Sequence, residues 1–153
     1  MLFDNRRENN MKACSEMVEA VLAALGYDVV SSRMQSDTGP AWGFSSGSAS
    51  VYIFLTSGEQ GDDYIQVISP VIRPGDDQRL FPRLLELNAT ELTGAAFGIR
   101  DQNVVLTTDR STSGLDRVEV EEMIRRVSEY ADYYDDILTV EFGGTRYCDL
   151  APE

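Results

Sequence analysis

The sequence predicts an α+β domain in which helices pack on a largely antiparallel sheet, in the order α-β-β-β-α-β-β-α. Three segments repeat apolar residues at helical spacing, and five short segments are rich in strand-forming residues. Successive strands are joined by short connections, which favours antiparallel pairing. The length of 153 residues fits one domain with a single core.

The first helix is expected over residues 11–25. Gly26 follows its last turn, where a left-handed residue typically ends a helix, and Tyr27 is placed to pack back on that turn. Asn9 or Asn10 is suited to cap its start. Helical spacing predicts one buried stripe, made of Met11, Cys14, Val18, Val21, Leu22 and Leu25.

A hairpin is expected after this helix. Residues 28–39 are mostly polar and rich in turn formers, so we expect a short edge segment and a loop there. Residues 42–44 then alternate aromatic and small side chains, and residues 50–56 are rich in strand formers. The pair Ser46-Gly47 between them is typical of a hairpin turn.

A third strand and a second helix follow. The strand is expected over residues 64–72, where Pro70 fits an edge position or a bulge, because proline cannot donate a ladder hydrogen bond. The helix is expected to start close to Arg79, since Pro82 is tolerated only in a first turn. Gly94 is expected to end it.

The last three elements are a hairpin and a helix. Residues 95–100 and 104–108 flank a turn at Asp101-Gln102-Asn103. Asp116 and Glu119 have the spacing of a capping box at the start of the final helix. The apolar stripe of that helix is Val120, Met123, Ile124, Val127, Ala131 and Tyr134.

The charge excludes several partners. The chain has 26 acidic and 13 basic residues, a formal net charge of −13. Nucleic acid and anionic membranes are bound by clustered cations, so we expect neither partner. No stretch approaches the roughly 20 apolar residues of a membrane span, and no signal segment precedes the first helix.

Few catalytic chemistries remain open to this chain. It contains no histidine, which excludes histidine-based nucleophile activation and imidazole metal ligands. Cys14 and Cys148 form no CxxC pair, and two cysteines are too few for a secreted disulfide scaffold. We therefore expect a cytoplasmic protein that is not an enzyme and needs no cofactor or metal.

Aromatic strand residues are the first candidate site. Trp42, Phe44, Tyr52 and Phe54 are candidates for partner binding, because residues 51–55 carry apolar side chains on both faces of one strand. A strand with one solvent-exposed face alternates apolar and polar residues instead. The second face is either covered within the monomer or meets another chain.

Acidic residues near the end of the last helix are the second candidate. Asp132, Asp135 and Asp136 are expected to oppose the helix dipole near the C-terminus, which indicates a basic partner. The alternative is that the helix frays after Tyr130 and solvent hydrates these charges. A carboxylate-based cation site or enzyme here is a further alternative.

Several segments resemble the YbjN family of bacterial proteins, described as sensory transduction regulators, whose fold is similar to that of type III secretion chaperones. The segments are Leu25-Gly26-Tyr27, Trp42-Gly43-Phe44, Val51-Tyr52-Ile53-Phe54-Leu55, Ile68-Ser69-Pro70-Val71, Leu84-Leu85-Glu86-Leu87-Asn88, Phe97-Gly98-Ile99 and Val104-Val105-Leu106. The resemblance implies a secretion-chaperone-like fold, a homodimer, and no cofactor or catalytic residue. Asn88 matches an asparagine of the family, which a hydrogen bond to the following loop explains.

The expected organisation is a YbjN-like domain at residues 11–138, an N-terminal extension at residues 1–10 and a tail at residues 139–153. The tail is typical of either an added strand or an ordered extension. The expected function is a chaperone-like or regulatory module that holds a protein segment on an apolar surface. A purely self-assembling structural domain is the other reading.

Overall fold

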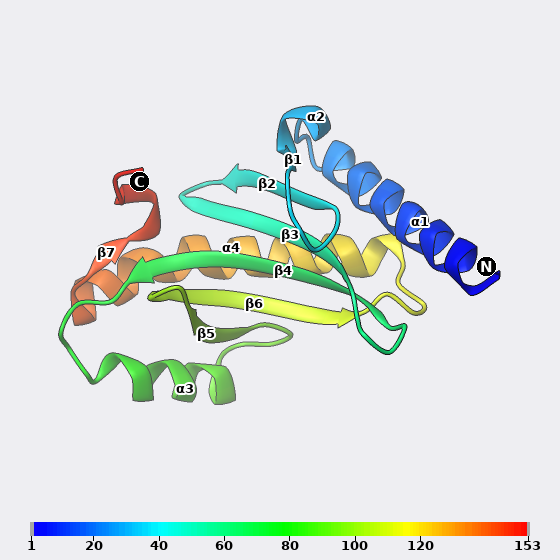
Figure 1. Cartoon of the computed structure of the whole chain (residues 1–153). Helices are drawn as coiled ribbons and strands as arrows, with labels where there is room; N and C mark the ends of the chain where they lie inside the picture. Colours follow the sequence, from blue (N-terminus) through cyan, green and yellow to red (C-terminus); the bar gives the residue numbers. More distant parts are fainter. Residues whose placement is uncertain (1, 153) are drawn as a thin grey trace. The chain divides into compact units, whose positions relative to one another are not determined.

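A computed structural model describes residues 2–152 of the chain (Figure 1). The helices are α1 (Leu2–Ala24), α2 (Val29–Ser32), α3 (Leu80–Thr90) and α4 (Arg117–Phe142), and a 3₁₀ turn covers Tyr147–Asp149. The strands are β1 (Arg33–Met34), β2 (Ala41–Ser46), β3 (Ala49–Ser57), β4 (Asp63–Arg73), β5 (Ala96–Arg100), β6 (Asn103–Ser111) and β7 (Thr145–Arg146). The predicted class and element order are confirmed, with short elements added at α2 and β7.

The strands form a sheet in the order β1-β2-β3-β4-β6-β5, and β7 pairs with β4. The predicted meander is confirmed, because β2, β3 and β4 are neighbours in chain order. Of the two alternatives for Pro70, the edge position is wrong, since β4 lies between β3 and β6, and the bulge stays a prediction. The Ser69 hydroxyl donates to the carbonyl oxygen of Ser50 at 2.7 Å, which supplies a bond to β3 beside a proline that has no amide hydrogen.

The described residues form two compact units. Unit 1 comprises residues 2–44, 52–66 and 109–122, and unit 2 comprises residues 45–51, 67–108 and 123–152.

In unit 1, α1 buries the predicted stripe at Cys14, Val18, Val21 and Leu22. Gly26 ends it as predicted, with a φ of +91°, and the Tyr27 amide donates to the carbonyl oxygen of Leu22 at 3.0 Å.

The expected start of this helix is wrong. It begins at Leu2, so Asn9 and Asn10 lie inside it and cannot cap it. Arg7 and Asn10 both contact Asp63 of β4. The additional N-terminal part of the helix therefore makes polar contacts with a distant strand. The periodicity of apolar residues does not reveal such contacts.

The expected edge segment of unit 1 is confirmed by β1, whose two residues pair with Ala41 and Trp42 of β2. The helical turn α2 before it was not predicted. Its signal is Asp28, whose Oδ1 accepts the Ser31 amide at 2.9 Å as an N-cap.

In unit 2, α3 buries Leu80, Leu84 and Leu87 and lies beside β5 (Figure 1). Pro82 lies in the first turn, as predicted. The expected end at Gly94 is wrong, because the helix ends at Thr90.

Asn88 joins α3 to β5, in line with the bond expected of it. Its Nδ2 donates to the carbonyl oxygen of Phe97 at 3.1 Å, and its Oδ1 accepts the Phe97 amide at 2.7 Å. The side chain therefore satisfies both backbone groups of one strand residue, a structural role that needs no ligand.

The second hairpin is confirmed. β5 and β6 pair from Ala96 with Thr107 to Arg100 with Asn103. Asp101 and Gln102 connect them with φ of 49° and 66°. Two left-handed residues in a two-residue loop match the right-handed twist of a hairpin.

The start of α4 is the predicted capping box. The Glu119 amide donates to Asp116 Oδ1 at 2.9 Å, and the Asp116 amide donates to Glu119 Oε2 at 3.0 Å. The other end differs from expectation, because the helix continues to Phe142 and β7 then pairs with Ile72 and Arg73 of β4. The expected tail therefore consists of a last helical turn and a short added strand.

Candidate functional site

Trp42 and Phe44 lie on the face of β2 that is directed at the α1 region of unit 1. Trp42 is buried, and its indole Nε1 donates to Glu19 Oε1 at 3.2 Å. Arg33 donates two bonds to the same carboxylate at 2.7 and 2.9 Å, which lowers the pKa of Glu19. The Phe44 ring lies 4.3 Å from the ring centroid of Tyr27. These two aromatic residues therefore pack inside unit 1.

Tyr52 and Phe54 lie on the other face of β3. They alternate with Ile53 and Leu55, which are completely buried, whereas Tyr52 and Phe54 are half-buried. Alternate residues of a strand point to opposite faces. The structure therefore separates the four predicted aromatic residues into two pairs on opposite faces.

Met34 joins Tyr52 on this second face. A Cβ atom built on Gly43 lies 2.6 Å from Met34 Sδ and 3.1 Å from a ring carbon of Tyr52. Both side chains therefore cover the backbone of Gly43, and a side chain at this position would have to displace the Met34 sulfur. Met34 is nevertheless 42% exposed.

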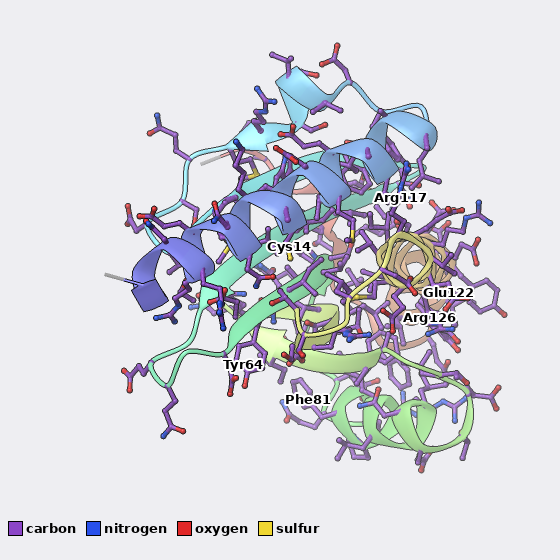
Figure 2. The ribbon with its side chains drawn as sticks, turned by 90° about the vertical axis from the view of Figure 1, so that its right-hand side faces the viewer. Cys14, Tyr64, Phe81, Arg117, Glu122 and Arg126 are labelled. Carbon is purple, nitrogen blue, oxygen red and sulfur yellow. The ribbon has the colours of Figure 1, made fainter. Side chains whose placement is uncertain are left out.

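Tyr64 extends the same face onto β4 and is 41% exposed (Figure 2). Its neighbours Asp63 and Ile65 are buried, and Asp63 accepts bonds from Arg7 and Asn10 of α1 at 3.3 Å each. Because Asp63 points to α1, Tyr64 points to the opposite side. We call Met34, Tyr52, Phe54 and Tyr64 the open sheet face.

The two cysteines have no strongly nucleophilic character. Cys14 is buried on α1 (Figure 2), and burial raises the pKa of its thiol. Cys148 is exposed, and partial desolvation also raises its pKa. Both thiols are therefore protonated at neutral pH, the form that is least reactive.

The three candidate aspartates, which all lie in unit 2, have partners within that unit. Asp132 Oδ1 accepts the Ser48 amide at 2.7 Å and the Ser48 hydroxyl at 2.8 Å, which lowers the pKa of Asp132. Asp135 is buried and accepts a bond from the same hydroxyl. Asp136 pairs with Arg146 at 3.0 Å.

The structural premise of the acidic candidate is wrong. Because α4 continues to Phe142, Asp132 lies well inside the helix, so it neither opposes the dipole at the helix end nor lies in a frayed segment. Within residues 2–152, no group of three or more cysteine, aspartate or glutamate side chains is placed to hold a metal ion.

None of the helices in the described part of the chain combines the length and hydropathy of a membrane span.

Sequence reasoning missed Met34 and Tyr64. Tyr64 precedes a run of strand formers, so the alternation of buried and exposed residues along β4 could have placed it. Met34 had no such signal, because its position follows from the pairing of β1 with β2.

Comparison with known proteins gives one family and solved structures of similar fold. A family model described as "T3SS (YopN, CesT) and YbjN peptide-binding chaperone 1", or TY-Chap1, matches residues 12–150. No curated protein matches the chain.

The solved structures with a similar fold include chains of two complexes. A chain of the ExsC–ExsE complex has a TM-score of 0.64 at 13% identity, over 84% of this chain and 95% of that one. A chain of the HopA1–SchA chaperone–effector complex has a TM-score of 0.58 at 11% identity, over 84% and 97%. These likenesses confirm the predicted secretion-chaperone-like fold.

Proposed function

The chain belongs to the TY-Chap1 family of type III secretion and YbjN peptide-binding chaperones, and on this basis we propose that it holds an apolar protein segment on the open sheet face. The family membership confirms the resemblance found in the apolar segments of the sequence. The proposed role is chaperone-like or regulatory and involves no catalysis.

The observation that carries this proposal is the group of large apolar side chains that remain partly exposed on unit 1. Met34, Tyr52, Phe54 and Tyr64 come from three different strands and lie on one face. Aromatic residues and methionine are enriched where proteins bind one another, because they bury much area and adapt to different partners. A protein segment that covers this face gains the hydrophobic free energy of these side chains.

Charge favours a segment with basic residues. The net charge of −13 produces a negative potential that attracts cationic partners and keeps the free protein soluble. Such a field increases the association rate, while the apolar contacts limit dissociation.

The test uses a bound partner obtained from a lysate of the source cells and identified by mass spectrometry. Its affinity for the wild-type chain is then compared by calorimetry with that for Tyr52→Ser/Phe54→Ser. We expect the double substitution to weaken binding by at least about tenfold, which corresponds to about 1.4 kcal/mol.

The matched control is Val118→Ser, which changes an exposed apolar residue in the first turn of α4, outside the open sheet face. Far-UV circular dichroism verifies that all variants fold. Equal affinity of the wild-type chain and the folded double variant would contradict the proposal.

We also propose a homodimer in which α3 takes part. Leu85 is exposed and Phe81, one turn before it, is half-buried, so both lie on a side of α3 away from its buried leucines (Figure 2 labels Phe81). Light scattering should give twice the mass of one chain for the wild-type protein. Leu85→Glu should shift it to the monomer, and a wild-type monomer at micromolar concentration would contradict the dimer.

The cytoplasm is the proposed compartment. Both cysteines are free, which fits a reducing environment where thiols do not pair. Fractionation of the source cells with an antibody to the chain tests this, and enrichment in another fraction would contradict it.

A further inference from the structure

The C-terminal half of α4 has a second apolar surface in unit 2, apart from the one it buries. Tyr133, Ile137 and Val140 are spaced four and three residues apart, so they lie in line on one side of the helix. Their exposed fractions are 63%, 37% and 88%. We call these three residues the α4 stripe.

The α4 stripe lies on a different side of the helix from the residues that are buried in unit 2. Ala131, Tyr134 and Leu138 are buried and form the inner side of the same segment. Single exposed apolar residues are ordinary on protein surfaces, but three in successive turns form a continuous strip. A helix with apolar residues on two sides has a second side available for another helix.

Carboxylates border this strip. Glu129 lies one turn before Tyr133, Asp136 lies between Tyr133 and Val140, and Glu141 lies one turn after Ile137; all three are exposed.

Two of these carboxylates have an arginine nearby, since Arg79 interacts electrostatically with Glu141 and Arg146 with Asp136. Arg146 bonds to Asp136 and to Asp149. The guanidinium of Arg126, labelled in Figure 2, lies against Gly94. Because Arg146 is shared between two carboxylates, the border of the strip keeps a net negative charge along an apolar centre.

We propose that the α4 stripe binds a basic amphipathic helix of a partner protein. Leucine-like side chains of such a helix cover Tyr133, Ile137 and Val140, while its lysines or arginines face Glu129, Asp136 and Glu141. A second copy of this chain fits less well, because two stripes in contact would bring acidic borders of like charge together. This surface consists of residues other than those of the open sheet face.

The test uses a fluorescent peptide of leucine and lysine whose leucines recur at helical spacing. Its scrambled form has the same composition and charge without an apolar side. At physiological salt we expect the helical peptide to bind the wild-type chain at least about tenfold more tightly than the scrambled form. We expect Tyr133→Ser/Val140→Ser to remove most of that difference.

Val118→Ser is the matched control, because Val118 is an exposed valine in the first turn of the same helix. It should bind the helical peptide as the wild-type chain does. Tyr52→Ser/Phe54→Ser should also retain this binding, which separates the present proposal from the proposed function.

Two results would overturn the proposal. Equal binding of the helical peptide to the wild-type chain and the folded Tyr133→Ser/Val140→Ser variant would show that the stripe is not the site. A loss of dimer in that double variant, measured by light scattering, would assign the stripe to self-association instead.

Discussion

Asp132 shows how a single carboxylate can organise a distant turn. It accepts both the amide and the hydroxyl of Ser48, at the end of a turn where Gly47 has a φ of +60°. A Cβ atom on Gly47 would lie 2.4 Å from Asp132 Oδ1. The Asp132 carboxylate therefore leaves no room for a side chain at position 47. Its function here is structural, because it holds the turn.

The first prediction concerns the pH dependence of this contact. The hydrogen bonds lower the pKa of Asp132 in the folded state below its unfolded value of about 3.9. The contact therefore stabilises the fold above that value, and this stability is lost as pH falls through the folded pKa.

Asp132→Asn keeps an acceptor oxygen but removes the charge, whereas Asp132→Ala removes both. Urea unfolding at pH 7 should show a cost of about 1–2 kcal/mol for alanine and a smaller cost for asparagine. At pH 3 the difference between the wild-type and asparagine chains should shrink. If the difference in free energy of unfolding between the wild-type and Asp132→Asn chains were the same at pH 7 and pH 3, the stabilising role of the Asp132 charge would be contradicted.

The second prediction concerns the two thiols. A thiol-specific reagent should label Cys148 in the native protein, because it is exposed, and leave Cys14 unreacted, because it is buried. Labelling should be slow at neutral pH, since the pKa of Cys148 is raised. Cys148→Ser should give no native labelling and one labelled thiol in denaturant, and native labelling of that variant would contradict the burial of Cys14.

At the scale of elements, β2 positions the open sheet face through a residue that has no side chain. Met34 of β1 and Tyr52 of β3 both rest over Gly43, so the shape of the face depends on the space that this glycine leaves. Its φ is not positive, and its importance is therefore steric.

The third prediction follows from this packing. Gly43→Ala should displace Met34 and Tyr52 and lower the free energy of unfolding by about 1 kcal/mol. It should also weaken partner binding, although it removes no apolar atom.

Gly98→Ala is the matched control, since its Cβ would meet Val105 at an ordinary 3.9 Å on another strand. Thermal unfolding and calorimetry check both variants. A Gly43→Ala chain that binds the partner as well as the Gly98→Ala chain would contradict the role of this packing.

Sequence reasoning found the long elements because their signals are local. The apolar stripe of α1, the turn at Asp101-Gln102 and the capping box at Asp116 each require only neighbours along the chain. The early start of α1 involves Asp63, 56 residues from Arg7, and no local pattern contains that contact.

The candidate site was predictable only in part for the same reason. Tyr52 and Phe54 follow from alternation along one strand. Trp42 and Phe44 were grouped with them by residue type, but the contacts with Glu19 and Tyr27 place these two on the opposite face. Pairing between distant segments decides which face of a strand packs against a helix. The aromatic residues alone therefore could not show which face each of them occupies.

At the scale of the whole molecule, the net charge of −13 opposes compaction. The fourth prediction is that the melting temperature rises when sodium chloride is added from low salt, because salt screens this repulsion. Exposed ion pairs such as Arg33 with Glu19 act in the other direction but contribute only about 0.2–1 kcal/mol each. Differential scanning calorimetry checks the direction, and a fall in melting temperature would show that local pairs outweigh the general repulsion.

The bond between Ser48 and Asp132 also affects the order in which the molecule can be completed. The two residues are 84 positions apart, and Asn10 and Thr112 are 102 apart. Contacts between such distant positions close late, because the chain must first lose the entropy of a long loop. A growing polypeptide can thus form the β2–β3 hairpin soon after it leaves the ribosome. Asp132, which accepts the hydrogen bonds of this turn, is present only when α4 has been synthesised. The contact between Ser48 and Asp132 therefore forms after most of the chain has been made.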